Sequence, residues 1–282
     1  MVSIIILSYN TEVLLRECLK SLYTTLSSMS FEVIVLDNAS SDGSVSMVRD
    51  QFKKVILIES EKNLGFAKGV NTAAERAKGD YLLFLNSDAN LLDRNLSEMV
   101  KKMEKDHAVA VVGGNLLNRD GTTSEAFGRF YNLPEVFSLL FLRKKAIHDS
   151  SKEMTPVDWV SGGYMVIRRE AFEKVGGFDE GFFMYIEDMD LCYRLRRAGL
   201  HVLYYKEAKA RHVGQGSSNR MFAIVNIYKG LLYFYKKQKP QWQYFVVKLL
   251  LTLKAVAAYV VGVIKNDDSL KATYAQALRV TL

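Results

Sequence analysis

Apolar runs and amphipathic stretches alternate through the first hundred residues, and this alternation restricts the fold more than any other feature of the sequence. The apolar runs are rich in β-branched and aromatic residues, as is typical of strands, and fall at 2–7, 31–36, 55–58 and 81–85. Helical periodicity fills the intervals at about 12–26, 43–52 and 66–77. Because such alternation builds βαβ units, we expect an α/β fold with a Rossmann-like, mainly parallel central sheet. The near-continuous hydrophobicity of the strands predicts helices on both sheet faces.

The chain after residue 108 is less regular, and we divide it into 109–218 and 219–282. Strands are expected within the first of these regions at 109–112, 164–167 and 201–205. An apolar run at 136–145 ends in three cations, which suits either a buried helix end or an interfacial helix. The second region differs in kind, because it is strongly apolar, rich in aromatic residues and predicted to be helical.

The balance of charge narrows the classes of partner. The 282 residues carry a formal net charge of +7, which is compatible with nucleic acid, anionic lipid or phosphorylated small molecules. Basic residues cluster at 143–145, 194–197 and 236–239, and two of these clusters flank apolar segments. That placement favours a membrane surface, and no nucleic-acid-binding motif is present, so we expect no nucleic-acid partner.

The cysteines and the N-terminus indicate the cytoplasm. Cys18 and Cys192 lie far apart, each in a predicted helix, which predicts two reduced core thiols rather than a disulfide. The strand-like start, VSIIIL, lacks the charged and long apolar regions of a signal peptide. We therefore expect a cytoplasmic body.

The segment 242–264 approaches the length of a membrane span, for which about 20 apolar residues are needed. Lys248 and Lys254 lie within it, and each would cost about 2.5–3.5 kcal/mol at the bilayer centre. A helix lying in the membrane interface, with snorkelling lysines, fits better than a spanning helix. A helix packed on the main domain is the alternative.

Polar residues follow three successive predicted strands. In open α/β sheets, ligands bind outside the carboxyl ends of the strands, so Tyr9, Asn10, Asp37 and Asp88 should converge on one cleft. Asp37 suits a hydrogen bond with a base or ribose, although DNASSDG is also a strong turn sequence. Neither GxGxxG nor a P-loop is present, so neither hydride transfer nor a P-loop phosphate site is indicated.

Three carboxylates crowd the start of a predicted helix. Asp190 has Arg194 four residues later and Arg197 seven residues later, which indicates a solvated salt-bridge face, and Glu187 lies on much the same side. Asp188 instead lies at the start of the apolar face of this predicted helix. An inward carboxylate is costly unless it meets a partner or a ligand-filled cleft, so Asp188 is the candidate for chemistry. Capping of the helix dipole is the alternative.

Taken together, six motifs resemble those of family 2 glycosyltransferases with the GT-A fold, of the bacterial rhamnosyltransferase type. They span about residues 3–218 in the family's order and read SYN, DNASSDGS, NLGFAKGVN, NSD, GGFDEGFFMYIEDMDLCYRLRRAG and RHVGQGSS. The resemblance implies that 1–108 binds a nucleotide sugar, that 109–218 is the acceptor-binding and catalytic half of the same domain, and that 219–282 is membrane-associated.

The resemblance also implies a nucleotide-diphosphate sugar donor. It places Tyr9 against the base, Asp37 at the polar edge of the base, and Asn63 and Lys68 beside the nucleotide or pyrophosphate. The full donor-binding set is Ser8, Tyr9, Asn10, Asp37, Asn63, Lys68, Asn86, Ser87 and Asp88.

A divalent cation is implied by the same resemblance. The NSD triplet occupies the position of the family's DxD motif, with Asn86 at its first acidic position and Asp88 as the metal ligand. His212 matches a second ligand. One carboxylate and one imidazole leave room for diphosphate oxygens, which suits Mg²⁺ or Mn²⁺.

The carboxylates of the acidic motif then acquire roles. Asp188 matches the general base that takes a proton from an acceptor hydroxyl, and a single in-line displacement would invert the anomeric centre. Glu187, Trp159, Gly162 and Gly163 are expected to contact the acceptor or sugar, although WVSGGY could instead be a buried tryptophan beside a tight turn.

The resulting expectation is an inverting enzyme that transfers rhamnose from dTDP-rhamnose to a lipid-linked or polysaccharide acceptor, peripheral on the inner face of the cell membrane. The alternatives are the same fold with a UDP-sugar donor, a non-catalytic nucleotide-sugar-binding protein at the membrane, and a nucleotidyltransferase. The usual glycine-rich, arginine-containing signature of the last class is missing. The oligomeric state stays open.

Overall fold

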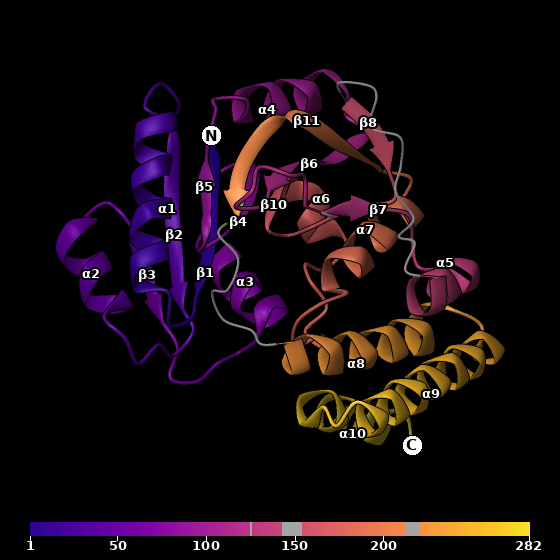
Figure 1. Ribbon diagram of the computed structural model, residues 1–282. Coiled ribbons are helices and arrows are strands. Elements are labelled where there is room, and N and C mark those ends of the chain that lie inside the picture. The colour runs from indigo at the N-terminus through magenta and orange to yellow at the C-terminus, as the bar shows by residue number, and fades with distance from the viewer. Residues whose placement is uncertain (125, 143–153, 213–219) are drawn as a thin grey trace.

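The computed structural model describes residues 1–124, 126–142, 154–212 and 220–282. Within these ranges, nine strands form one sheet in the order β3-β2-β1-β4-β10-β6-β11-β5, with β8 also paired to β11 (Figure 1). The strands are β1 Val2–Ser8, β2 Phe31–Asp37, β3 Ile56–Glu59, β4 Tyr81–Asn86, β5 Ala89–Leu91, β6 Val109–Leu117, β8 Met154–Val157, β10 Tyr164–Arg168 and β11 His201–His212. A separate small ribbon pairs β7, Phe127–Gly128, with β9, Trp159–Val160.

The sheet confirms the α/β prediction. Strand β1 pairs in parallel with β2 and β4, and β11 pairs in parallel with β6. Strand β10 is antiparallel to both of its neighbours, β4 and β6. Strand β11 runs well beyond the 201–205 expected from sequence, because a register shift between Tyr205 and Lys209 lets its pairing with β6 continue. The polar residues at the irregularity had interrupted the hydrophobic pattern.

Helices cover both faces of the sheet, as the hydrophobic strands predict. Along β1, Ile4 and Ile6 pack into one apolar cluster and Ile5 into the other. The first cluster includes α1 (Glu12–Thr25), α2 (Ser44–Gln51) and α4 (Leu96–Lys105). The second includes α3 (Phe66–Ala74), α6 (Arg169–Lys174), α7 (Glu187–Arg197) and α8 (Arg220–Gln238). Cys18 and Cys192 are buried free thiols, one in each cluster, as expected.

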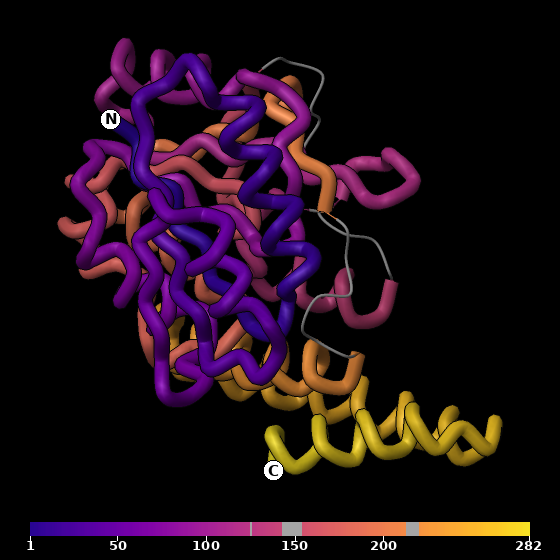
Figure 2. The backbone as a smooth tube through the Cα atoms, turned by 90° about the vertical axis from the view of Figure 1, so that its left-hand side faces the viewer, coloured from indigo at the N-terminus to yellow at the C-terminus, as the bar shows by residue number. Residues whose placement is uncertain are grey.

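The C-terminal region forms three helices at one end of the molecule. After α8, α9 spans Gln241–Ile264 and α10 spans Asp268–Thr281 (Figures 1 and 2). Helix α9 is long and apolar enough to cross a membrane by length and composition, but a stripe of its residues, including Val247, Leu251 and Ala255, is buried inside the protein. The region 219–282 was expected to be helical, but the bounds of α10 were not predicted from the sequence.

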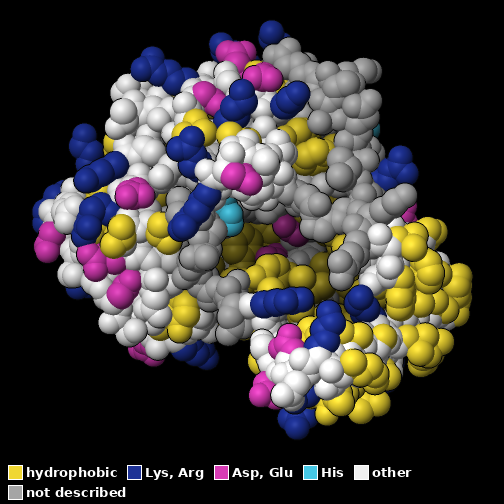
Figure 3. Space-filling model, in the orientation of Figure 1, with side chains coloured by type: hydrophobic (Ala, Val, Ile, Leu, Met, Phe, Trp, Pro, Cys, Tyr) yellow, Lys and Arg dark blue, Asp and Glu magenta, His cyan; other side chains and the backbone are white. Residues whose placement is uncertain are grey.

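The outward side of α9 is apolar and exposed. Its exposed large hydrophobic residues are Trp242, Phe245, Val246, Leu249, Leu253, Val256, Tyr259, Val260, Val261, Val263 and Ile264. The adjacent helical turns, α5 (Leu133–Phe137) and a π-helix (Ser138–Leu142), add Phe137, Phe141 and Leu142. Figure 3 shows apolar side chains gathered over this end of the molecule. Lys248 and Lys254 are only partly exposed. The cations at 143–145 lie outside the described residues.

The predicted environment of two carboxylates on α7 is wrong. Asp190 was expected on a solvated face with Glu187 beside it, yet Asp190 is fully buried and Glu187 is 5% exposed. The expected Asp190–Arg194 ion pair does form, with 2.7 Å between Nε and Oδ2. The second oxygen of Asp190 accepts a hydrogen bond from Gln238 Nε2, at the end of α8, at 2.8 Å. Helix α8 covers this face of α7, and no local pattern around residue 190 reveals that packing.

We predict that Asp190→Ala lowers the free energy of unfolding by about 3–5 kcal/mol, because it leaves the largely buried guanidinium of Arg194 without its partner. Glu98→Ala is the matched control. It removes the exposed Lys101 pair on α4 and should cost less than about 1 kcal/mol. Urea unfolding of both variants measures the difference, and equal losses would contradict a structural role for the buried pair.

Candidate active site

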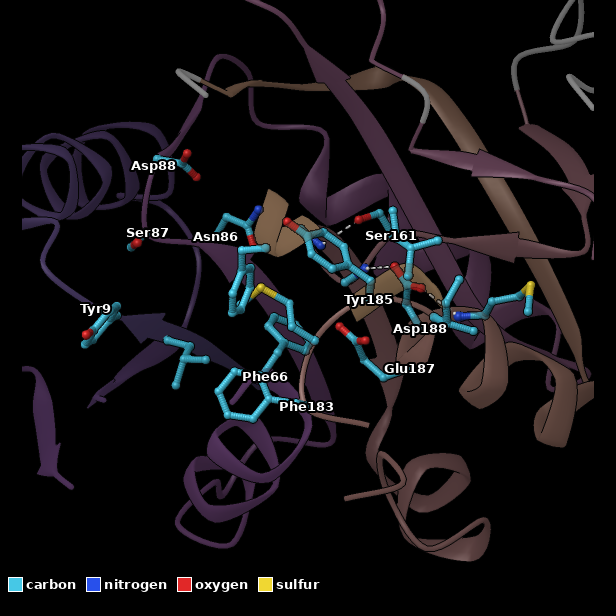
Figure 4. A pocket seen from close by; sticks show the side chains of 18 of the residues that line it. Tyr9, Phe66, Asn86, Ser87, Asp88, Ser161, Phe183, Tyr185, Glu187 and Asp188 are labelled. Carbon is cyan, nitrogen blue, oxygen red and sulfur yellow. Dashed lines mark hydrogen bonds between the residues drawn. The ribbon is translucent and has the colours of Figure 1, made fainter. Parts of the chain in front are cut away.

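A cavity of about 750 Å³ opens at the carboxyl ends of the central strands (Figures 3 and 4). The sheet explains its position, because Ser8 is in register with Asp37, and Leu7 with Asn86. The chain therefore leaves β1, β2 and β4 at the same edge. Most of the residues selected from sequence line the cavity: Tyr9, Asn63, Asn86, Ser87, Asp88, Trp159, Gly162, Gly163, Glu187, Asp188 and His212.

The remaining four predicted residues lie just behind or outside this wall. Ser8 and Asn10 organise the loop after β1: the Ser8 hydroxyl meets that of Thr11, and Asn10 Oδ1 accepts from the amide of Ser41 at 2.7 Å. Lys68 is exposed and pairs with Glu180 at 3.4 Å, so it does not line the cavity.

Asp37 makes the turn contact considered for it and has one oxygen left unpaired within the described ranges. Its Oδ2 accepts a hydrogen bond from the amide of Ser40 at 2.8 Å, the contact expected of a turn residue. Its Oδ1 is buried and has no hydrogen-bond partner within the described ranges. A buried unpaired carboxylate oxygen is costly, and a donor group on a ligand would satisfy it. Its role at a base stays a prediction.

Asn63 shapes the neighbouring loop as well as facing the cavity. Its Oδ1 accepts from Asn38 Nδ2 and from the amide of Gly65, both at 2.9 Å. Asn38 in turn accepts from the amide of Leu64 at 2.7 Å. The loop that enters α3 is thus fixed by side-chain amides.

Asp88 and His212 approach each other at the cavity wall. His212 Nε2 lies 3.0 Å from Asp88 Oδ1 and 3.3 Å from Asn86 Nδ2. The hydrogen bond with Asp88 raises the pKa of His212. A carboxylate oxygen and an imidazole nitrogen facing one another fit a divalent cation, with its other positions left for ligand oxygens. No cluster of three or more metal-binding side chains occurs in the described part of the chain, so a cation here would depend on substrate oxygens. The predicted glycine-rich loop after His212 lies outside the described residues.

The turn that enters α7 is strained. Tyr185 and Ile186 both adopt positive φ angles, of 71° and 75°, which is unusual for a non-glycine residue and most costly for a β-branched one. Gly230 on α8 packs against this turn, since a Cβ there would lie 2.9 Å from both Tyr185 O and Ile186 Cγ1. The close packing of α8 holds the turn, and the turn places the next two residues, Glu187 and Asp188, in the cavity wall.

Asp188 accepts several hydrogen bonds as a carboxylate. The amides of Met189 and Gly162 donate to it at 2.7 and 3.4 Å, and the Ser161 hydroxyl also contributes. Burial nevertheless raises the pKa of Asp188 to about 6, against these donors. Such a carboxylate is ionised at neutral pH and basic enough to accept a proton.

The glycines beside Asp188 make close contacts with side chains of the protein, and their expected role toward the acceptor or sugar stays a prediction. A Cβ on Gly162 would lie 2.9 Å from the Phe66 ring, and one on Gly163 would lie 3.0 Å from Asn86 Nδ2. Trp159 is partly buried, and its indole donates to Arg129 O at 2.9 Å. The tryptophan therefore lines the cavity and is also anchored structurally.

Several residues of the wall were missed from sequence. They are Leu7, Thr11, Asn38, Phe66, Tyr131, Leu139, Ser161, Phe183, Met184, Tyr185, Ile186, Met189, Phe222 and Ile227. The aromatic cluster just before the acidic motif was a usable signal for Phe183 and Tyr185. Phe222 and Ile227 belong to α8, which reaches the cavity only through tertiary packing.

Comparison with known proteins identifies the family of this chain. Residues 3–176 match the family described as Glycosyl transferase family 2, and residues 143–215 match the one described as N-terminal domain of galactosyltransferase. N-acetylglucosaminyl-diphospho-decaprenol L-rhamnosyltransferase of Mycobacterium tuberculosis (strain CDC 1551 / Oshkosh) is 26% identical, over 67% of this chain and 68% of that protein. Rhamnosyltransferase WbbL of Escherichia coli K12 is 30% identical, over 79% of this chain and 87% of that protein.

A solved structure shares the fold. The mannosyltransferase PcManGT from Pyrobaculum calidifontis, in complex with GDP-Man and Mn²⁺, superposes with a TM-score of 0.59 at 18% identity, covering 99% of this chain and 85% of that one. The family match spans the strands and loops that build most of the cavity described above. The chain belongs to the family 2 glycosyltransferases.

Proposed function

We propose that this protein is an inverting, metal-dependent glycosyltransferase that transfers L-rhamnose from dTDP-rhamnose to a lipid-linked or polysaccharide acceptor. The observation that carries the proposal is the division of the cavity wall. Asp88, with His212 beside it, lies on one side, and Asp188, with its raised pKa, lies on the other (Figure 4). A donor between them would present its diphosphate to the pair and its anomeric carbon toward Asp188.

The proposed chemistry needs one proton transfer. Asp188 takes the proton of an acceptor hydroxyl, the hydroxyl oxygen bonds to the anomeric carbon, and the bond to the nucleotide diphosphate breaks. Asp88 and His212 would hold Mg²⁺ or Mn²⁺, which neutralises charge on the leaving diphosphate. Tyr9 and Asp37 are proposed to contact the base, and Trp159, Gly162 and Gly163 to border the acceptor.

The names of the two relatives described above favour rhamnose as the transferred sugar. The second family match, to a galactosyltransferase domain, favours the alternative of a UDP-sugar donor. Thermal shifts measured with dTDP-rhamnose, UDP-galactose and UDP-N-acetylglucosamine, each with and without Mn²⁺, distinguish the two donor classes. A binding protein without catalysis would show the shift but no release of nucleotide diphosphate.

We predict that Asp188→Asn reduces turnover by about 10²-fold or more while donor binding persists, because the general base is lost. The native rate should rise with pH through about 6, where the Asp188 carboxyl loses its proton. Release of nucleotide diphosphate, followed across pH, measures both effects. Asp106→Asn, the same change at a partly exposed residue after α4, is the control, and near-native turnover of Asp188→Asn would refute the assignment.

His212→Ala should abolish most of the Mn²⁺-dependent part of donor binding, since the imidazole is one of two proposed protein ligands. The measurement is the shift in melting temperature with the nucleotide sugar, titrated with Mn²⁺. His201→Ala, at the exposed start of β11, should titrate like the native protein. An unchanged titration for His212→Ala would exclude the ligand role.

The exposed face of α9 is proposed to rest on the inner face of the cell membrane. Phe245, Leu249 and Leu253 are each more than half exposed and lie along one side of the helix. The basic run at 236–239 directly precedes α9 and would attract anionic lipid. The same face could instead contact a second copy of the chain.

Replacing Phe245, Leu249 and Leu253 by Glu together should release the protein from vesicles of phosphatidylethanolamine and phosphatidylglycerol in a sedimentation assay. The substitutions leave the buried stripe of α9 intact, so the fold should persist. Val13→Glu, at an exposed residue of α1, is the control on another surface. Undiminished sedimentation of the triple variant would argue against this membrane surface, and a change from dimer to monomer on gel filtration would support the second copy.

A further inference from the structure

Glu187 presents a second carboxyl to the cavity, and the proposed mechanism has no use for it as a base. The side chain is 5% exposed and lines the cavity directly beside Asp188. Its Oε2 is enclosed and has no hydrogen-bond partner in the part of the chain that the structure describes. Figure 4 shows the carboxyl pointing into the cavity. A buried polar atom left unpaired costs free energy, and an ionised one costs much more.

The two adjacent carboxyls have opposite surroundings. Asp188 receives hydrogen bonds from two backbone amides and a hydroxyl, all of which stabilise a negative charge. Among the described hydrogen bonds, Glu187 has no side-chain donor and accepts only from its own backbone amide, and it faces the charge of Asp188. When two neighbouring carboxyls are placed in environments this different, the poorly solvated one keeps its proton.

We propose that Glu187 is a neutral carboxylic acid that donates a hydrogen bond to an oxygen atom of the bound acceptor, next to the hydroxyl that Asp188 deprotonates. This inference rests on the proposed function. In the protonation state of lowest free energy, Oε2 is the enclosed carbonyl oxygen and Oε1 carries the proton. A neutral group there also avoids adding a second negative charge to a cavity that must accept a diphosphate.

The pKa values agree with this division. Burial, and then the charge of Asp188, raise the pKa of Glu187 well above its ordinary value. The other titratable groups on the cavity wall are Tyr9, Asp88, Tyr131, Tyr185 and His212, and Asp188 is the one whose charge acts on Glu187. Activity then requires Asp188 without its proton and Glu187 with its proton. The pH profile of activity should therefore be bell-shaped. Activity rises through the pKa of Asp188 and falls where Glu187 loses its proton.

Three substitutions separate a neutral donor from an ionised carboxylate. Glu187→Gln keeps a neutral hydrogen-bond donor of similar shape, so it should stay within about tenfold of native kcat and lose the alkaline fall of the pH profile. Glu187→Ala removes the donor and should lose about ten- to hundredfold in kcat/KM for the acceptor. Glu187→Asp shortens the side chain and should fall between them. Glu98→Gln, the same change on exposed α4, serves as the control.

The outcomes are distinct. If Glu187→Gln is as defective as Glu187→Ala, or keeps the alkaline fall, the neutral-donor inference is wrong. Infrared difference spectra of the protein without substrate, recorded on raising the pH from a value at which Asp188 has already ionised, should show loss of a protonated carboxyl band in the native chain and not in Glu187→Gln. Absence of that band from the native chain also overturns the inference. Because the spectra need no turnover, they test Glu187 even if no nucleotide sugar proves to be a donor, which would count against the proposed function alone.

Discussion

The buried contact between Asp190 on α7 and Gln238 on α8 fixes the position of the cavity's acidic residues. Asp190 is fully buried, and both of its oxygens are used, one by Arg194 and one by Gln238. Arg194 in turn donates to Val175 O at 2.6 Å, which ties α7 to the segment after α6. A carboxylate held in this way cannot take part in chemistry. It does fix the position of the two acidic residues that precede it in the cavity wall, Asp188 and Glu187.

Helix α8 supports the same region from a second point. Its glycine at position 230 permits contact with the strained turn at Tyr185 and Ile186, and Tyr235, also on α8, donates to Tyr131 O at 2.7 Å. A turn with two consecutive non-glycine residues at positive φ persists only where surrounding structure over-determines it. The packing of α8 holds this strained turn in one conformation. Glu187 and Asp188, which follow the turn, therefore occupy fixed places in the cavity wall.

The sequence predicted the sheet well, because strand hydrophobicity and turn chemistry are local signals. The same local signals identified the strand-end residues Tyr9 and Asp88, whose convergence follows from parallel pairing alone. Helical spacing separated Asp188, which lines the cavity, from Asp190, which does not, but it misjudged the surroundings of Glu187 and Asp190. The catalytic role of Asp188 stays a prediction. Spacing reports which side of a helix a residue occupies, whereas burial depends on what packs there. The covering element, α8, begins thirty residues after Asp190, and its polar end gave no sign of a buried contact.

The C-terminal helices are therefore not a detachable anchor. One surface of α8 reaches the cavity through Phe222 and Ile227, its last turn holds Asp190, and Pro240 then leads directly into α9 with its exposed apolar side. Helix α9 is packed along α8 and α10 by its buried stripe, so removing α9 and α10 would uncover apolar surface of α8 itself. A protein shortened at residue 240 would lose support for the acidic turn as well as its proposed membrane face. Substitutions on the outward side of α9 separate these two effects, because they change the surface that meets lipid and leave the packing behind Asp188 in place.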